Sequence, residues 1–135
     1  MSAFSLKIVT ADGLLFDGQA EKLIVRTTAG DMAVLAKHID CVAALGMGMA
    51  TVVAETGERK VAACIGGMLS VQNGNVTLVP TTFEWAESID AARALASQER
   101  AEKVLRDSSA SATDIALAEA RLHRALVRKS VASYK

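Results

Sequence analysis

The first two thirds of the chain alternate between short apolar runs and polar turn residues. The runs are rich in Val, Ile, Leu and Thr, and Gly, Asn or Asp separates them at short intervals. Apolar and polar positions that alternate over about four to eight residues are typical of β-strands that bury one face. The pattern predicts strands at residues 4–10, 14–16, 22–28, 32–35, 50–55, 59–65, 68–71 and 76–79.

The gaps between these runs carry residues that favour tight turns. Glycine follows Asp12, Asp17, Thr56 and Asn73. Glycine adopts positive φ without steric cost, which two-residue hairpin turns require. We therefore predict a two-layer β-sandwich that closes on one core and occupies residues 1–86.

The composition changes after Pro80, because the rest of the chain has no Pro or Gly and is rich in Ala, Arg, Glu and Leu. These residues favour helices. We expect a helix at 89–105 and a second at 114–131, joined by a polar turn. The fold class is therefore α+β, mainly β, with an antiparallel helical hairpin at residues 87–135.

Side-chain oxygens that can cap these helices stand at each expected start. Ser88 precedes the first helix, and either Ser111 or Thr113 precedes the second. The buried face of the first helix would be mostly alanine with Leu95, Val104 and Leu105. Because burial yields only about 0.8 kcal/mol per CH₂-sized group, such a face holds the hairpin weakly and leaves it free to move.

The second helix is amphipathic and basic. Ile115, Ala118, Leu122 and Ala125 fall on one stripe at helical spacing. A second stripe is positively charged and consists of Arg121, Arg124 and Arg128. Residues 114–135 carry a net charge of +3 in a chain that is neutral overall, so an acidic partner is implied.

Composition excludes several classes of protein. Lys+Arg and Asp+Glu both number 15, so no overall field attracts nucleic acid or an anionic membrane. Residues 61–83 carry no charge, but Gly and Asn divide them into strand-length pieces rather than a membrane span. The N-terminus lacks the pattern of an export signal. Cys41 and Cys64 sit in apolar runs and are expected to be small buried hydrophobes.

No motif for a metal site or for independent catalysis is present. A metal site needs three or four ligands, and His38, Asp40 and Cys41 have no second histidine nearby in the sequence. Gly46 and Gly48, like the later Gly66-Gly67 pair, lack the Lys-Ser/Thr of a phosphate loop and are interpreted as glycines of strand turns or bulges.

One polar constellation lies on the first helix. Asp90, Arg93, Ser97 and Arg100 recur at helical spacing and are expected to share a face. One interpretation is a solvated face in which Asp90 pairs with Arg93. The other is an anion cradle, in which these arginines and one from the second helix hold the phosphates of a nucleotide.

The ordered set of motifs resembles the epsilon subunit of the rotary F-type ATP synthase. The residues that carry this resemblance span the chain: Leu6 to Gly13 with Phe16-Asp17-Gly18, Val25 to His38, Ile65-Gly66-Gly67 with Val71, Asn75 to Leu78, Ile89-Asp90-Ala91-Ala92-Arg93-Ala94, and Arg124-Ala125 with Arg128. No single motif is specific to this family, but the order of the motifs along the chain is.

The resemblance implies a non-catalytic subunit of the central stalk, peripheral on the cytoplasmic face of a bacterial membrane. It implies that the sandwich, at 1–86, contacts the gamma subunit and the ring of c subunits. Asp31 and His38 are the polar contacts with the ring that it implies. The membrane is reached only through the complex, and no nucleic acid is bound. The alternative is a free-standing sandwich adaptor for another acidic protein.

The resemblance also implies a regulatory role for the hairpin, at 87–135. An extended hairpin would meet acidic segments of the beta subunits in the alpha/beta head and obstruct hydrolysis through Arg121, Arg124 and Arg128. A folded hairpin would bind ATP as a regulatory ligand, while no cofactor is required. The nucleotide-binding residues that it implies are Glu84, Asp90, Arg93, Arg100, Arg124 and Arg128.

Overall fold

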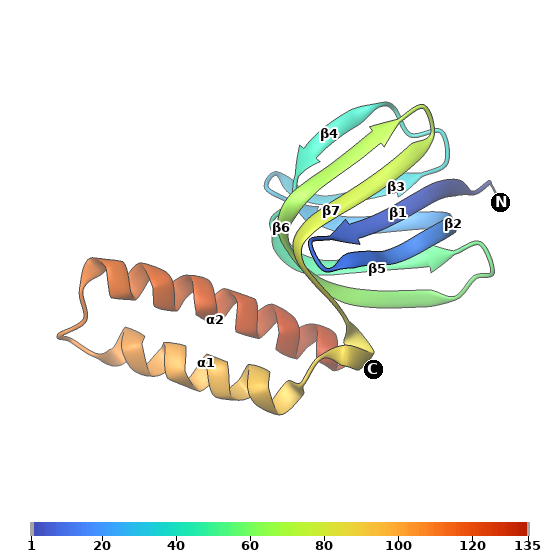
Figure 1. Ribbon diagram of the computed structural model, residues 1–135. Helices are drawn as coiled ribbons and strands as arrows, with labels where there is room; N and C mark the ends of the chain where they lie inside the picture. Colours follow the sequence, from blue (N-terminus) through green and yellow to red (C-terminus); the bar gives the residue numbers. More distant parts are fainter. Residues whose placement is uncertain (1, 135) are drawn as a thin grey trace. The chain divides into compact units, whose positions relative to one another are not determined.

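The computed structural model describes residues 2–134, and the chain divides into two compact units after Trp85. The first unit contains the strands and the second contains the helices (Figure 1). The strands are β1 (Phe4–Thr10), β2 (Gly13–Thr27), β3 (Gly30–Leu35), β4 (Cys41–Ala44), β5 (Met47–Ala54), β6 (Arg59–Gln72) and β7 (Asn75–Trp85).

Three long strands, β2, β6 and β7, take part in both layers of the first unit. In one layer, β1 pairs with the first half of β2 and, in parallel, with the start of β7, while β4 pairs with the end of β6. In the other layer, the first half of β6 pairs with β5, and the second half of β2 lies between β5 and β3. The pairing of β6 with β7 joins the two layers. This is the expected β-sandwich.

The core between the layers follows the alternation in the sequence. In β1, Phe4, Leu6 and Ile8 are buried while Lys7 is exposed. Equivalent positions from the other strands, among them Leu69, complete one cluster of buried apolar side chains. Burial of each such side chain contributes roughly 1.5–3 kcal/mol to the free energy of folding, so this apolar core dominates the stability of the sandwich.

Some predicted strand boundaries are wrong. The turn expected at Asp17-Gly18 does not form, because Gly18 pairs with Leu6 and the chain stays extended through β2. The predicted strands at 59–65 and 68–71 are likewise one strand, β6, whose pairing with β7 continues across the gap. Strand β4 was not predicted, since its four residues carry little pattern. Turns with positive φ are confirmed at Gly13, Gly57 and Gly74.

Gly66 and Gly67 lie where β6 passes from one layer to the other. Their φ angles are 69° and 105°, which disfavour residues with a Cβ atom. Gly67 also lies against the backbone of β7, where a Cβ atom would overlap the carbonyl oxygen of Val79. Both glycines lie within the continuous strand β6 and not in a turn between strands.

The two cysteines differ in their surroundings. Both are free thiols. Cys64 is 2% exposed in the core, and this burial raises the pKa of its thiol to about 12, so it is protonated and unreactive at neutral pH. Cys41 is only partly buried and packs at the edge of the core, so the prediction that both are fully buried is wrong for Cys41.

The second unit consists of a short 3-10 turn, η1 (Ala86–Ser88), and the helices α1 (Ala91–Arg106) and α2 (Ala112–Ala132). Asp90, not Ser88, caps α1, because its carboxylate accepts a hydrogen bond from the backbone N–H of Arg93 at 3.0 Å. Ser88 belongs to η1 and lies too early in the chain for this role. No helix in the described range is both long and apolar enough to cross a membrane.

Ser111 caps α2 through a reciprocal pair of hydrogen bonds with Asp114. The Asp114 backbone N–H donates to the Ser111 hydroxyl at 3.1 Å, and the Ser111 N–H donates to the Asp114 carboxylate at 3.3 Å. This capping box satisfies two N–H groups that the first turn of a helix leaves without partners. Of the two caps considered for α2, Ser111 is therefore correct.

Four alanines spaced by seven residues form the centre of the contact between α1 and α2. Ala94 and Ala101 on α1, and Ala118 and Ala125 on α2, are each at most 4% exposed. Their small side chains let two helices approach closely but bury little apolar area. Leu95, expected at this contact, is 42% exposed, while the expected Val104 and Leu105 are half-buried.

The predicted apolar stripe of α2 divides in the same way. Ala118 and Ala125 are buried and Leu122 is half-buried, but Ile115 is exposed. The larger apolar residues therefore flank the alanine contact instead of filling it. This arrangement agrees with a hairpin that is held by shallow packing.

Candidate functional site

A groove of about 710 Å³ runs along one side of the helical hairpin and is rich in arginine. Arg100 reaches it from α1, and Arg121, Arg124 and Arg128 reach it from α2. Side chains three and four positions apart share one side of a helix, so the three α2 arginines follow one side of the alanine contact. Arg124 and Arg128 are half-buried, whereas Arg100 and Arg121 are exposed.

Hydroxyl groups add polar contacts along this arginine groove. Ser97 lines it from α1, and Ser109 lines it from the turn between the helices. The Ser97 hydroxyl can donate to an anion, whereas the Ser109 hydroxyl already donates to Asp107. Guanidinium groups bind phosphate or carboxylate oxygens with two N–H groups at once. The groove therefore has the chemistry of a site for an anion.

Two carboxylates, Asp107 and Asp114, also line the arginine groove, but both are engaged in the turn. Asp107 accepts hydrogen bonds from the backbone N–H and the hydroxyl of Ser109 at 2.9 Å and 2.7 Å. The Ser109 hydroxyl and N–H lower the pKa of the Asp107 carboxyl, which stays ionised. Asp114 belongs to the capping box with Ser111.

Three of the four groove arginines are not neutralised by carboxylates of the described residues. Among residues 2–134, no carboxylate forms an ion pair with Arg100, Arg121 or Arg124. An anion that enters the groove can therefore bind these three guanidinium groups without first breaking a salt bridge.

The predicted constellation on the first helix is only partly brought together. Ser97 and Arg100 line the arginine groove, but Asp90 is turned back as the cap of α1. Arg93 lies one heptad before Arg100, is exposed, and does not line the groove. Arg93, Ser97 and Arg100 share one face of α1 at helical spacing, but Asp90 lies before the helix and serves as its cap.

Glu84 is not part of the helical unit. It lies on β7 opposite Ala63 of β6, within the sandwich. β7 extends to Trp85 and η1 follows it, so Glu84 does not belong to the helices that carry the arginines expected to bind the nucleotide.

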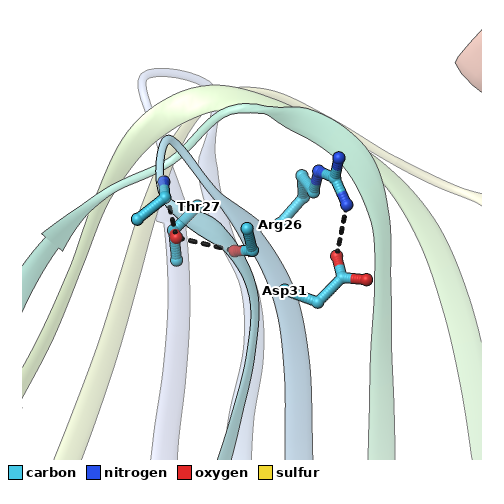
Figure 2. Close-up of polar contacts among 5 residues, drawn as sticks. Arg26, Thr27 and Asp31 are labelled. Carbon is cyan, nitrogen blue, oxygen red and sulfur yellow. Dashed lines mark hydrogen bonds and ion pairs between the residues drawn. The ribbon is translucent and has the colours of Figure 1, made fainter.

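Asp31, the first predicted contact with the ring, lies at the tip of the β2–β3 hairpin. Figure 2 shows that the Arg26 guanidinium faces it, with Nη1 3.2 Å from Oδ1. The turn is held by Thr27, whose hydroxyl donates to the Gly30 carbonyl at 2.7 Å and accepts from the Ala29 N–H at 3.1 Å (Figure 2). Sequence analysis did not predict this ion pair.

His38, the second predicted contact, lies beyond the other end of β3. Its Nδ1 is 2.8 Å from the carbonyl oxygen of Ile39, and the side chain is half-buried. The nearby Asp40 carboxylate accepts a hydrogen bond from the Asn73 N–H at 3.0 Å, which ties this loop to the turn between β6 and β7. The structure therefore does not bring Asp31 and His38 together, since the length of β3 separates them.

An apolar surface on the outer side of β4, β6 and β7 was not predicted. We call it the apolar face, and it consists of Val42, Ala44, Met68 and Val79. The register places Ala44 opposite Met68 and Met68 opposite Val79, and the three larger side chains are 46–67% exposed. Met68 and Val79 could have been identified from strand alternation once the register was known.

Three sets of similarities to known proteins agree. Residues 3–86 match the family described as ATP synthase, delta/epsilon chain, β-sandwich domain, and residues 87–133 match its long α-helix domain. The ATP synthase epsilon chain of Bacillus velezensis is 42% identical over 132 residues, covering 98% of each protein. That of Caldanaerobacter subterraneus subsp. tengcongensis is 37% identical over 130 residues, covering 96% of this chain and 94% of the relative.

Solved structures show the same fold. A chain of the Euglena gracilis mitochondrial ATP synthase aligns with a TM-score of 0.85 at 23% identity, covering 100% of this chain and 83% of that one. A chain from the central stalk and c-ring structure of the Tetrahymena thermophila enzyme aligns with a TM-score of 0.67 at 12% identity, covering 95% of both. On the two matching domains and the nearly full-length relatives, this chain belongs to the ATP synthase delta/epsilon chain family, as an epsilon-type subunit.

Proposed function

We propose that this chain is a non-catalytic subunit of the central stalk, which links rotation of the c-ring to the catalytic head and restrains ATP hydrolysis through its helical hairpin. Its proposed place is the cytoplasmic face of a bacterial membrane, reached through the complex. Family membership supports the assembly, and the apolar face is the observation that carries the proposal for the sandwich.

The apolar face has the character of a protein interface. Met68 lies between Ala44 of β4 and Val79 of β7, and Val42 lies two residues before Ala44 on the same side of β4. The opposite side of the same strands fills the core. Contiguous exposed apolar side chains on a folded domain mark binding surfaces, and their removal from water drives association. We assign this face to the gamma subunit, because a stalk subunit needs one extensive contact that does not slip during rotation.

A charge on the apolar face should prevent this contact. We expect the Met68→Asp, Val79→Asp double variant to retain less than about a tenth of the gamma subunit that the wild type retains on co-purification, since burying two carboxylates costs more than 1.4 kcal/mol. Leu35→Asp is the control, because Leu35 is 53% exposed and lies on β3, in the other layer of the sandwich. Equal retention by the double variant and the wild type would refute the assignment, and purification of the wild type without gamma would favour a free-standing adaptor.

The c-ring contact is proposed for the tip of the β2–β3 hairpin, with Asp31 as its polar residue. His38 lies at the other end of β3, and a partner that touches both must span about 20 Å along this strand. The Asp31 tip is the smaller and more exposed of the two, so it suits contact with a polar loop of the ring, which turns together with the stalk.

The arginine groove supports a second function for the hairpin, the binding of ATP without hydrolysis. Arg100 from one helix and Arg124 and Arg128 from the other face a common space that could hold phosphates. A ligand that bridges both helices favours the folded hairpin to the extent that it binds this form better than the extended one. Asp90 acts as a cap here and Glu84 lies on β7, so the proposal assigns phosphate binding to the groove arginines alone.

Calorimetric titration of the full chain with ATP tests this second function. We expect saturable heat for the wild type and affinity about 100-fold lower for Arg100→Ala, Arg124→Ala, because each lost charge-assisted hydrogen bond costs roughly 1.5–3 kcal/mol. Arg106→Ala is the control, since Arg106 is an exposed arginine of α1 outside the groove. No saturable heat at millimolar ATP, or equal binding by the double variant, would end the proposal.

A further inference from the structure

The tip of the β2–β3 hairpin presents an ion pair and not a lone carboxylate. Arg26 and Asp31 are direct cross-strand partners, and the guanidinium contacts only one carboxylate oxygen, Oδ1. In Figure 2 the second oxygen of Asp31 points away from Arg26. The side chains are 52% and 67% exposed, so a partner can reach both of them.

The aliphatic part of the Arg26 side chain packs against a glycine of β5, Gly48. Gly48 lies on β5, and a Cβ atom there would come within 2.6 Å of Arg26 Cβ and 3.0 Å of Arg26 Cγ. Gly48 does not have a positive φ, so backbone conformation does not explain the glycine. Its role is to leave room for the aliphatic part of the Arg26 side chain. The neighbouring Gly46 contacts the same residue, because its N–H donates to the Arg26 carbonyl at 2.9 Å.

Three strands therefore determine where the Asp31 carboxylate points. β5 supplies the glycine, β2 supplies the arginine, and β3 supplies the aspartate. An exposed ion pair adds little to folding stability, because solvent screens it and holding two side chains costs entropy. Its effect is on the orientation and charge of the tip.

The geometry points to Arg26 as a positioning residue for the c-ring contact, a conclusion that rests on the function proposed for Asp31. Arg26 holds one oxygen of Asp31, directs the other outward, and cancels the net charge of the tip. Such a tip offers the outward carboxylate oxygen of Asp31 as an acceptor. It fits a polar partner loop that supplies a hydrogen-bond donor, such as a side-chain amide, and it does not require a bare cation.

Photo-crosslinking in the assembled ATP synthase tests this inference. A photoreactive residue replaces Ala29, which is exposed at the same tip, and the yield of the product with the c subunit is measured at low and high salt. Arg26→Ala should lower the yield roughly threefold or more and make the remainder fall with salt, because Asp31 then carries an unpaired charge. Lys22→Ala is the control, as an exposed basic residue elsewhere on β2.

A second pair of variants separates positioning from direct contact. In an Asp31→Asn background, Arg26→Ala should have no further effect, because Arg26 acts through the carboxylate. Gly48→Ala should reproduce the effect of Arg26→Ala, with its melting temperature measured to confirm that it folds. If the wild type gives no product with the c subunit, the proposed ring contact itself is wrong. If it does, and Arg26→Ala gives an equal yield or acts independently of Asp31, only the role of Arg26 is overturned.

Discussion

Replacing Gly67 with alanine should lower the free energy of unfolding by about 3–5 kcal/mol, which is a large part of the 5–15 kcal/mol typical of a domain. Two effects add at this position. The φ of 105° is rarely adopted by residues with a Cβ atom. The new atom would also overlap the carbonyl oxygen of Val79 and lie 2.5 Å from Pro80 Cα, so β6 and β7 would have to separate.

Gly57→Ala provides the matched control for this prediction. Gly57 has a φ of 90°, but no atom lies within 4 Å of the Cβ that alanine would add. The Gly57→Ala variant should lose only about 1–2 kcal/mol of the free energy of unfolding, because alanine there has an unfavourable φ but overlaps no other atom. Urea unfolding of both variants gives the comparison. Equal losses would mean that β7 does not approach Gly67 as closely as described.

Replacing Arg121, Arg124 and Arg128 with alanine should raise the rate of ATP hydrolysis by the assembled enzyme roughly fivefold or more, while leaving synthesis largely intact. The proposed contact places these charges against acidic segments of the beta subunits when the hairpin is extended. Removing three charges weakens that contact and with it the restraint on hydrolysis. Steady-state ATPase rates of complexes assembled with each variant measure the effect.

Lys129→Ala is the control for charge alone, because Lys129 is an exposed cation of α2 that does not line the arginine groove. If the triple variant leaves hydrolysis unchanged in an enzyme that the wild-type chain is shown to inhibit, the three arginines face solvent and do not contact the beta subunits. Because the same arginines line the groove proposed for ATP, the two roles exclude each other. ATP in the groove should therefore favour the uninhibited enzyme.

Local sequence patterns were sufficient where local interactions decide the structure. The alternation in β1 predicts its bounds, because Phe4, Leu6 and Ile8 fill one core. The start of α2 was predicted to within two residues, because the residues that satisfy each other in its first turn, Ser111 and Asp114, are close in the sequence. The turn after Asn73 was also correct, since positive φ is a property of the residues themselves.

Predictions failed where a distant segment decides the outcome. Asp17-Gly18 has the composition of a turn, but its pairing with β1 keeps it extended. Leu95 has the spacing of a buried residue, but the alanines bring the helices together beside it and leave it exposed. The apolar face depends on the register of three strands, with Met68 opposite Val79.

The candidate sites show the same division. Spacing along α2 could place Arg121, Arg124 and Arg128 on one side, but only the packing of α1 shows that Arg100 joins them and that Arg93 does not. Arg26 and Asp31 become partners only once the turn at 28–29 is located, because a shift of one residue would place them on opposite sides of the sheet.

The most direct measurement of the central proposal is ATP synthesis driven by an ion gradient in membranes whose enzyme has been depleted of its epsilon subunit. Adding back the full chain should restore synthesis with saturation near one chain per complex, and the Met68→Asp, Val79→Asp variant should fail to do so. A chain that binds the depleted enzyme but leaves synthesis unchanged, or that does not bind it at all, would contradict a role in coupling within the central stalk.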